Sequence, residues 1–157
     1  MKIAILYDSK YGNTKQLAEF LAEKTQAGGH EVQLFRTTKT KPAKLLAFQP
    51  VAILVGGPTH WGRPARTLSK YIKTLGKIGH LSTIHKAAVF NCNTGDDVCK
   101  TIQNQISDAL PQIEILEKSL PMCTGGQNGT NWKQVALPNN WKEHASIFIS
   151  AFLNFLS

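Results

Sequence analysis

The sequence predicts a doubly wound α/β fold: a five-stranded parallel sheet in the order 2-1-3-4-5 with helices on both faces. The first observation behind this prediction is that short, continuously apolar runs alternate with amphipathic stretches, a pattern typical of strands buried on both faces. The second is the length of 157 residues, which suits one domain over residues 1–157 without a linker or repeat. The third is an ordinary globular composition, with 42% apolar and 18% charged residues.

The first elements follow from apolar spacing and from glycine. The run Lys2–Tyr7 predicts a strand that is buried in its middle. Leucines and alanines recur at helical spacing over Thr14–Gln26, and Gly28-Gly29 ends this helix. Glu31–Phe35 alternates polar and apolar residues, so we expect a strand nearer the edge of the sheet.

The middle of the chain predicts one short helix, a strand and a longer helix. The short helix spans about Pro42–Phe48, and Val51–Val55 is as apolar as the first strand. Pro64 suits the first turn of a helix that continues through Leu75.

The remaining elements complete the alternation. The sequence predicts strands over Ala87–Phe90 and Glu114–Leu120, a helix over about Asp96–Ala109, a loop over Pro121–Asn131, and a last helix, capped within Leu137–Asn140, that ends near Leu156.

Several classes of protein are not expected. No apolar run approaches the ~20 residues that cross a bilayer, so we expect no transmembrane segment. The apolar run at residues 3–6 is followed at once by Asp8, which does not resemble a signal peptide, and we expect a cytoplasmic location. Neither the three cysteines nor the five histidines have the spacing of a disulfide framework, a redox pair or a metal site.

The charge of +8 is concentrated in the middle of the chain. Between Glu31 and Asp96 there is no acidic residue, whereas the same stretch holds Arg36, Lys39, Lys41, Lys44, Arg63, Arg66, Lys70, Lys73, Lys77 and Lys86. This stretch therefore creates a strong local positive field.

Ligands of doubly wound folds bind at the carboxyl ends of the strands, beside strands one and three. The loop after strand one comprises Ser9, Lys10, Tyr11, Gly12, Asn13 and Thr14. Backbone N–H groups at a helix start, the helix dipole and hydroxyl groups can together bind a phosphate, and Gly12 permits close approach of the backbone. The alternative is a plain turn in which Asn13 or Thr14 caps the helix.

The run D-S-K-Y-G-N-T-K-Q-L-A resembles the phosphate loop of the flavodoxin family, T/S-x-T/S-G-N-T. Ser9, Gly12, Asn13 and Thr14 match this pattern, and Tyr11 departs from it because a hydroxyl amino acid is common there. The resemblance covers nearly the whole chain and is to the short-chain type. It implies a flavodoxin-like fold, FMN as the cofactor, and chemistry that belongs to the flavin.

The loop after strand three turns sharply and contains two rings. The resemblance implies that Pro58, Thr59, His60, Trp61 and Gly62 line the flavin, with Trp61 stacked on it. The alternative is that Trp61 packs beneath the loop and His60 faces water.

The loop after strand four offers Asn91, Asn93, Thr94 and Gly95, whose amides and small side chains can hydrogen-bond the polar edge of a flavin. The family often has an aromatic residue near Asp96 or Asp97, and its absence here implies a more open second flavin face. We expect those two aspartates to cap the following helix.

Five basic residues of the third helix are spaced three and four apart, from Arg63 to Lys77, and therefore share one face. Leu68, Ile72 and Leu75 should face the sheet. A helix on the same side of the sheet should add Lys39, Lys41 and Lys44 to this basic surface. Electron carriers of the family are typically acidic, so this chain departs from them.

The first hypothesis is an FMN-binding electron-transfer protein whose redox partner has an acidic docking surface. One alternative is an FMN-dependent oxidoreductase that acts directly on a quinone, a porphyrin-like molecule or an anionic small-molecule substrate. Another is a non-catalytic module that binds an acidic partner. We do not expect a nucleic acid partner, because no aromatic residues are interleaved with the lysines and arginines of the third helix.

Overall fold

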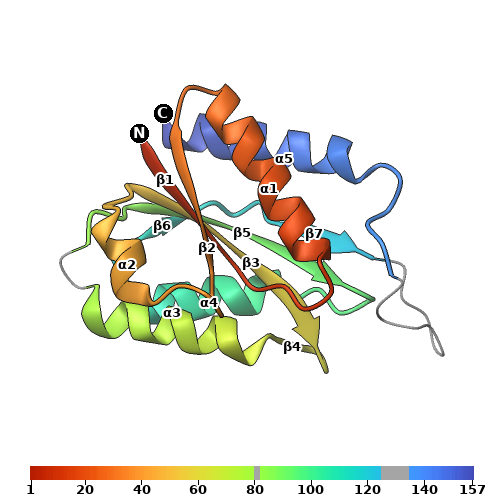
Figure 1. Cartoon of the computed structure of the whole chain (residues 1–157), viewed down its shortest axis with the longest axis horizontal. Coiled ribbons are helices and arrows are strands. Elements are labelled where there is room, and N and C mark those ends of the chain that lie inside the picture. Colours follow the sequence, from red (N-terminus) through yellow and green to blue (C-terminus); the bar gives the residue numbers. More distant parts are fainter. Residues whose placement is uncertain (80–81, 125–134) are drawn as a thin grey trace.

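The computed structural model describes residues 1–79, 82–124 and 135–157. The elements in chain order are β1 (Lys2–Tyr7), α1 (Asn13–Ala27), β2 (Glu31–Arg36), α2 (Pro42–Ala47), β3 (Ala52–His60), β4 (Arg63–Pro64), α3 (Arg66–Ile78), β5 (Lys86–Asn93), α4 (Cys99–Ala109), β6 (Glu114–Ile115), β7 (Leu120–Cys123) and α5 (Trp141–Leu156). One sheet lies between α1 and α5 on one face and α2, α3 and α4 on the other (Figure 1).

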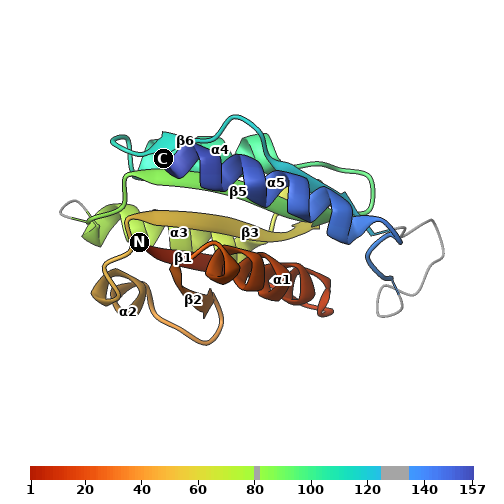
Figure 2. The same cartoon turned by 90° about the horizontal axis from the view of Figure 1, so that it is seen from above.

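The main strands run in the order β2-β1-β3-β5-β6, with β7 also paired to β5 and β4 paired to β3. Figure 2 shows these strands across the sheet. The 2-1-3-4-5 order expected from the sequence is confirmed, because β5 is the fourth strand and β6 and β7 together are the fifth. The switch point lies where β1 pairs in parallel with both β2 and β3.

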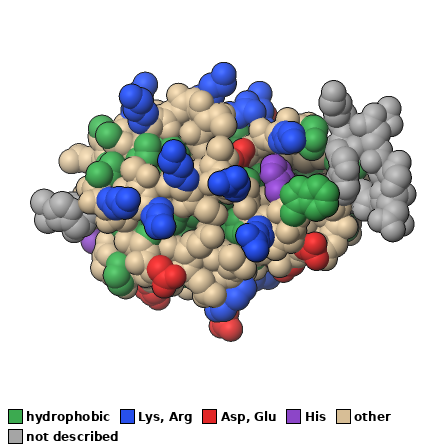
Figure 3. Space-filling view, turned by 90° about the horizontal axis from the view of Figure 1, so that it is seen from below, with side chains coloured by type: hydrophobic (Ala, Val, Ile, Leu, Met, Phe, Trp, Pro, Cys, Tyr) green, Lys and Arg blue, Asp and Glu red, His purple; other side chains and the backbone are tan. Residues whose placement is uncertain are grey.

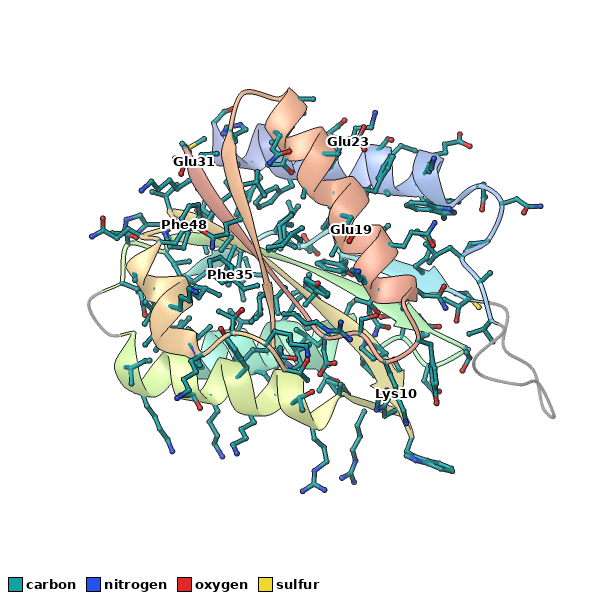
Figure 4. All side chains as sticks on the ribbon, viewed as in Figure 1. Lys10, Glu19, Glu23, Glu31, Phe35 and Phe48 are labelled. Carbon is teal, nitrogen blue, oxygen red and sulfur yellow. The ribbon has the colours of Figure 1, made fainter. Side chains whose placement is uncertain are left out.

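Alternating residues of each central strand fill two separate cores. In β1, Ile3 and Ile5 pack towards α1 and α5, whereas Ala4 and Leu6 pack towards the other three helices. The rings of Phe35 and Phe48, labelled in Figure 4, lie 5.9 Å apart between β2 and α2. No helix in the described ranges is long and apolar enough to cross a membrane.

β3 extends further than the sequence indicated, and this changes the start of the next helix. Gly56–Pro58 continue the parallel pairing with β5, and Thr59 and His60 pair with β4 in a hairpin. A Cβ at Gly56 would lie 2.2 Å from the Phe90 ring, so only glycine fits there. Pro64, expected in the first turn of the helix, is a β4 residue instead, and α3 begins at Arg66.

The fifth strand is divided into β6 and β7. The fourth strand, β5, spans Lys86–Asn93 and is longer than the expected Ala87–Phe90. The Gln103 side chain donates hydrogen bonds to the carbonyls of Leu116 and Glu117, at 3.2 and 3.3 Å, in the segment between β6 and β7. The chain rejoins the sheet as β7, so residues 121–123, expected in a loop, form a strand. Most of the rest of that loop prediction lies outside the described residues.

Candidate functional site

The loops after β1, β3 and β5 meet around one cavity of about 470 Å³ at the carboxyl ends of the strands. Twelve residues expected at a ligand site line it: Ser9, Lys10, Tyr11, Asn13, Thr14, Pro58, Thr59, His60, Trp61, Gly62, Asn93 and Thr94. Figure 4 labels Lys10 at this edge of the sheet. The cavity lies at the switch point, where the fold class predicted a ligand site.

Three expected residues do not line the cavity, and four others do. Gly12, Asn91 and Gly95 are absent from its lining, whereas Cys92, Asp96, Thr124 and Val135 contribute to it. Cys92 lies between two expected residues at the end of β5, but the alternation of a strand places neighbouring side chains on opposite faces and so gave no signal for it. Thr124 and Val135 are distant in sequence from the three loops and carry no motif.

The loop after β1 is held in shape before any ligand arrives. Gly12 has φ +97°, a left-handed conformation that favours glycine, and it precedes the first residue of α1. The Ser9 hydroxyl accepts hydrogen bonds from the N–H groups of Gly12 and Lys15, both at 3.2 Å. The Arg36 guanidinium donates to the Ser9 carbonyl at 2.7 Å, so the adjacent strand fixes the loop as well.

The start of α1 is open to an anion. Neither Asn13 nor Thr14 provides a side-chain cap for the helix. Among the described residues, the N–H groups of these two positions have no acceptor. A Cβ placed on Gly12 would meet no atom of the described residues within 4 Å, so none of these residues crowds the start of the helix. The first N–H groups of a helix carry partial positive charge, and this end of the cavity suits a phosphate.

Trp61 occupies the tip of the β3–β4 hairpin. His60 pairs with Arg63, and the two residues between them, Trp61 and Gly62, have φ values of +53° and +71°. A two-residue turn with both φ values positive is usually Asn-Gly, because other residues are strained by about 1 kcal/mol there. The Trp61 side chain is nevertheless fully exposed on the cavity wall, which excludes the alternative that it packs beneath the loop.

Asn91 joins two walls of the cavity from behind. It is fully buried, and its amide donates to the Gly57 carbonyl at 2.9 Å and to the Thr59 hydroxyl at 3.1 Å. The Thr59 hydroxyl has one proton and donates it to the Asp96 carbonyl at 2.8 Å. The Asn93 amide donates to the Asn91 side-chain oxygen at 3.2 Å. The polar end of β5 therefore holds the hairpin and the next loop together.

The two aspartates after β5 have different positions. The Asp97 carboxylate accepts the N–H of Cys99, the first residue of α4, at 2.8 Å, but the N-cap position itself is Val98, not Asp97 as expected. Asp96, also expected to cap, lines the cavity instead. Its carboxylate lies beside Gly62, 3.7 Å from where a Cβ of that residue would be.

The cavity contains a thiol that stays neutral. Cys92 lines the cavity but is buried, and burial raises the pKa of its thiol to about 11, although a hydrogen bond with Thr14 acts in the opposite direction. Because a neutral thiol is a poor nucleophile, Cys92 is a packing residue of this wall.

A basic surface begins beside this cavity. We define the α3 basic face as Arg66, Lys70, Lys73 and Lys77 together with Arg63, all of which are exposed. Arg63, expected on the helix, is a β4 residue instead and lies just before it in the chain. Leu68, Ile72 and Leu75 are buried against the sheet, as the spacing predicted. The exposed Lys39, Lys41 and Lys44 lie on and before α2, which packs next to α3. Figure 3 shows lysine and arginine side chains distributed over this side of the molecule.

A family model described as a flavodoxin domain matches residues 4–119. The chain is 32% identical over 93 residues to an NAD(P)H dehydrogenase (quinone) of Azorhizobium caulinodans, covering 48% of this chain and 47% of that protein. It is 28% identical over 102 residues to an NAD(P)H dehydrogenase (quinone) of Caulobacter vibrioides, and the match covers 54% of this chain and 51% of that protein. The chain thus spans about half the length of the curated relatives it matches.

Solved structures show the same fold. Oxidised flavodoxin 1 of Bacillus cereus superposes over 100% of both chains with a TM-score of 0.78 and 15% identity. A mutant flavodoxin of Pseudomonas aeruginosa superposes with a TM-score of 0.75 and 18% identity, and the match covers 98% of this chain and 97% of that one. A rubredoxin oxygen:oxidoreductase of Desulfovibrio gigas superposes with a TM-score of 0.73 and 16% identity. This match covers 99% of this chain and 37% of the larger one.

Proposed function

The chain belongs to the flavodoxin domain family, whose cofactor is FMN, and from that premise we propose that it transfers electrons between a partner protein and FMN bound in the cavity. The observation that carries this proposal is the meeting of three elements at one cavity: an open helix N-terminus, a fully exposed tryptophan and a wall of amide groups.

The residues present fit FMN. The N–H groups of Asn13 and Thr14, which have no acceptor among the described residues, would hold the phosphate at the start of α1 together with the Thr14 hydroxyl. Trp61 would lie against the planar ring and would bury there the apolar surface that it now exposes. Asn93 and Thr94 would hydrogen-bond the polar edge of the ring. When bound, FMN supplies the redox chemistry, while the protein supplies position and electrostatics.

The partner that fits this chain has an acidic surface. Arg63 is adjacent to the hairpin turn, so the α3 basic face begins beside the proposed flavin position. Positive charge around a redox site steers an acidic partner towards it and speeds association at low salt. Because the acidic carriers of the family would dock on basic partners, this chain would dock on a different set of partner proteins.

A direct oxidoreductase is the second candidate. The β5 side of the cavity is formed by Cys92, Asn93, Thr94 and Asp96, none of which could cover the second face of the flavin with an aromatic ring. A small planar acceptor such as a quinone could then approach the ring. Similarity to proteins named NAD(P)H dehydrogenase (quinone) supports this candidate over about half of their length.

Steady-state turnover separates the two candidates. The FMN-loaded protein would be mixed with NADH or NADPH and a soluble quinone, with and without an added flavoprotein reductase. A carrier turns over only when the reductase is present, and exchanging an acidic reductase for a basic one should slow the turnover. Sustained turnover without a reductase would instead establish the oxidoreductase.

A further inference from the structure

A second hollow of about 690 Å³ lies between α3 and α4, apart from the residues of the cofactor cavity. Its lining comprises Ser69, Lys70, Ile72, Lys73, Gly76 and Lys77 on α3, and Gln105, Asp108 and Ala109 on α4. We call it the α3–α4 groove. It is on the sheet face that Figure 3 shows from outside.

Close packing of the two helices forms the floor of this groove. A Cβ on Gly76 would lie only 2.6 Å from the Ala109 carbonyl oxygen, so the helices approach to the limit that glycine allows. The Ser69 hydroxyl donates to the side-chain oxygen of Gln105 at 3.1 Å and links the helices at a second point. The groove is therefore a fixed feature between two packed helices.

The walls of the groove carry unbalanced positive charge. Lys70, Lys73 and Lys77 contribute three ammonium groups, against the single carboxylate of Asp108. Within residues 1–79, 82–124 and 135–157, none of the three lysines makes an ion pair with a carboxylate. The amide nitrogen of Gln105 likewise donates to no described residue and remains available to a ligand.

We propose that the α3–α4 groove binds an acidic polypeptide segment of a partner protein. Carboxylates of the segment would meet Lys70, Lys73 and Lys77, and an apolar side chain would contact the floor at Gly76 and Ala109. That the partner is the redox partner rests on the proposed function, whereas binding of the segment itself needs no flavin.

The chemistry of the groove favours a polypeptide over other anions. A membrane surface is flat and would not reach a concave floor. Asp108 repels a uniformly anionic chain of phosphates, while a peptide can place an N–H donor there. Among the residues that the structure describes, no aromatic side chain lines the groove, and these residues give nucleic acid bases nothing on which to stack.

The test measures the fluorescence anisotropy of a labelled synthetic peptide of Asp, Glu and Leu residues, titrated with the full chain at low salt. The double variant Lys70→Glu, Lys73→Glu should weaken binding about tenfold or more, because two attractions become repulsions. The matched control Lys24→Glu, Lys142→Glu changes net charge equally on exposed positions of α1 and α5 and should leave binding nearly unchanged.

A second variant, Gln105→Glu, adds one negative charge from α4 and should also weaken binding, independently of any change in α3. Equal losses in the control and in the groove variants would overturn the proposal, as would tighter binding of a labelled single-stranded oligonucleotide of the same charge. Each titration is repeated with and without FMN. If the chain binds the peptide but does not bind FMN at all, the proposed function is refuted and the groove proposal stands.

Discussion

The side-chain amide of Asn91 donates a hydrogen bond to the hydroxyl of Thr59 at 3.1 Å, so the end of β5 holds the last residues of β3 in place. Thr59 in turn donates to the carbonyl of Asp96. One buried amide thereby fixes two of the three loops that form the cavity, although it does not itself line that cavity.

The first prediction concerns this buried amide. Asn91→Ala leaves the Gly57 carbonyl and the N–H of Val98 without their side-chain partner, and unsatisfied buried groups of this kind should lower the free energy of unfolding by about 2–3 kcal/mol. FMN affinity should fall with it, because the hairpin loses its anchor. Chemical denaturation and FMN titration measure both effects, and the exposed Asn104→Ala on α4 is the control. An unchanged stability would contradict the anchoring role.

The second prediction sets stability against binding at Trp61. Trp61→Asn gives the hairpin the Asn-Gly turn that positive φ values favour, so the free energy of unfolding should rise by up to about 1 kcal/mol. The same change removes the exposed ring, and FMN affinity should fall about tenfold. Urea unfolding and flavin fluorescence quenching report the two quantities separately. Loss of stability, or full retention of affinity, would refute this account of the hairpin.

The third prediction concerns Tyr71, whose buried hydroxyl has no hydrogen-bond partner among the described residues. Burial raises its pKa from 10.0 to about 12, so the folded chain keeps a proton that the unfolded chain releases in this interval. The ionisation of Tyr71 therefore does not affect stability below pH 10, and the folded state loses stability relative to the unfolded chain as the pH rises towards about 12.

Tyr71→Phe should therefore flatten the alkaline decline in stability and raise the free energy of unfolding at neutral pH by roughly 1 kcal/mol. Denaturant unfolding at several pH values measures both. If the variant and the wild type decline in parallel between pH 10 and about 12, this tyrosine does not cause the decline.

The fourth prediction concerns the redox potential. A unit positive charge at ~10 Å, at an effective dielectric of 20 to 40, stabilises an anionic reduced flavin by roughly 0.8–1.7 kcal/mol before salt screening. Arg63→Gln should accordingly lower the reduction potential of bound FMN by a few tens of millivolts. Potentiometry at low salt measures it, with Lys24→Gln on α1 as the control. A shift of the same size in both variants would contradict a local effect of Arg63.

Hydrophobic patterning was sufficient to predict the architecture. The runs Lys2–Tyr7 and Ala87–Phe90 are apolar because helices cover both of their faces, and the order of the strands followed from the fold class. The spacing of Leu68, Ile72 and Leu75 correctly placed the buried side of α3, and therefore the side that is basic.

The ends of the strands could not be predicted in this way. Gly56, Gly57 and Pro58 read as loop residues, yet they remain in β3 because β5 continues beside them and Gly56 makes room for the Phe90 ring. Asn91 read as a ligand-contacting residue because its burial depends on Gly57 and Thr59, two partners that are distant in sequence. Polar residues at strand ends can point into a site or support it, and only the tertiary hydrogen bonds distinguish the two.

The most direct test of the central claim is a fluorescence titration of the chain with FMN and, separately, with riboflavin, following both flavin and tryptophan emission. We expect a one-to-one endpoint with FMN and quenching of both signals, since Trp61 lies on the cavity wall. Riboflavin lacks the phosphate and should bind about tenfold or more weakly, because hydrogen bonds from the start of α1 to a charged group are lost. Equal affinity for the two flavins, or no quenching by either, would contradict the assignment of this cavity to FMN.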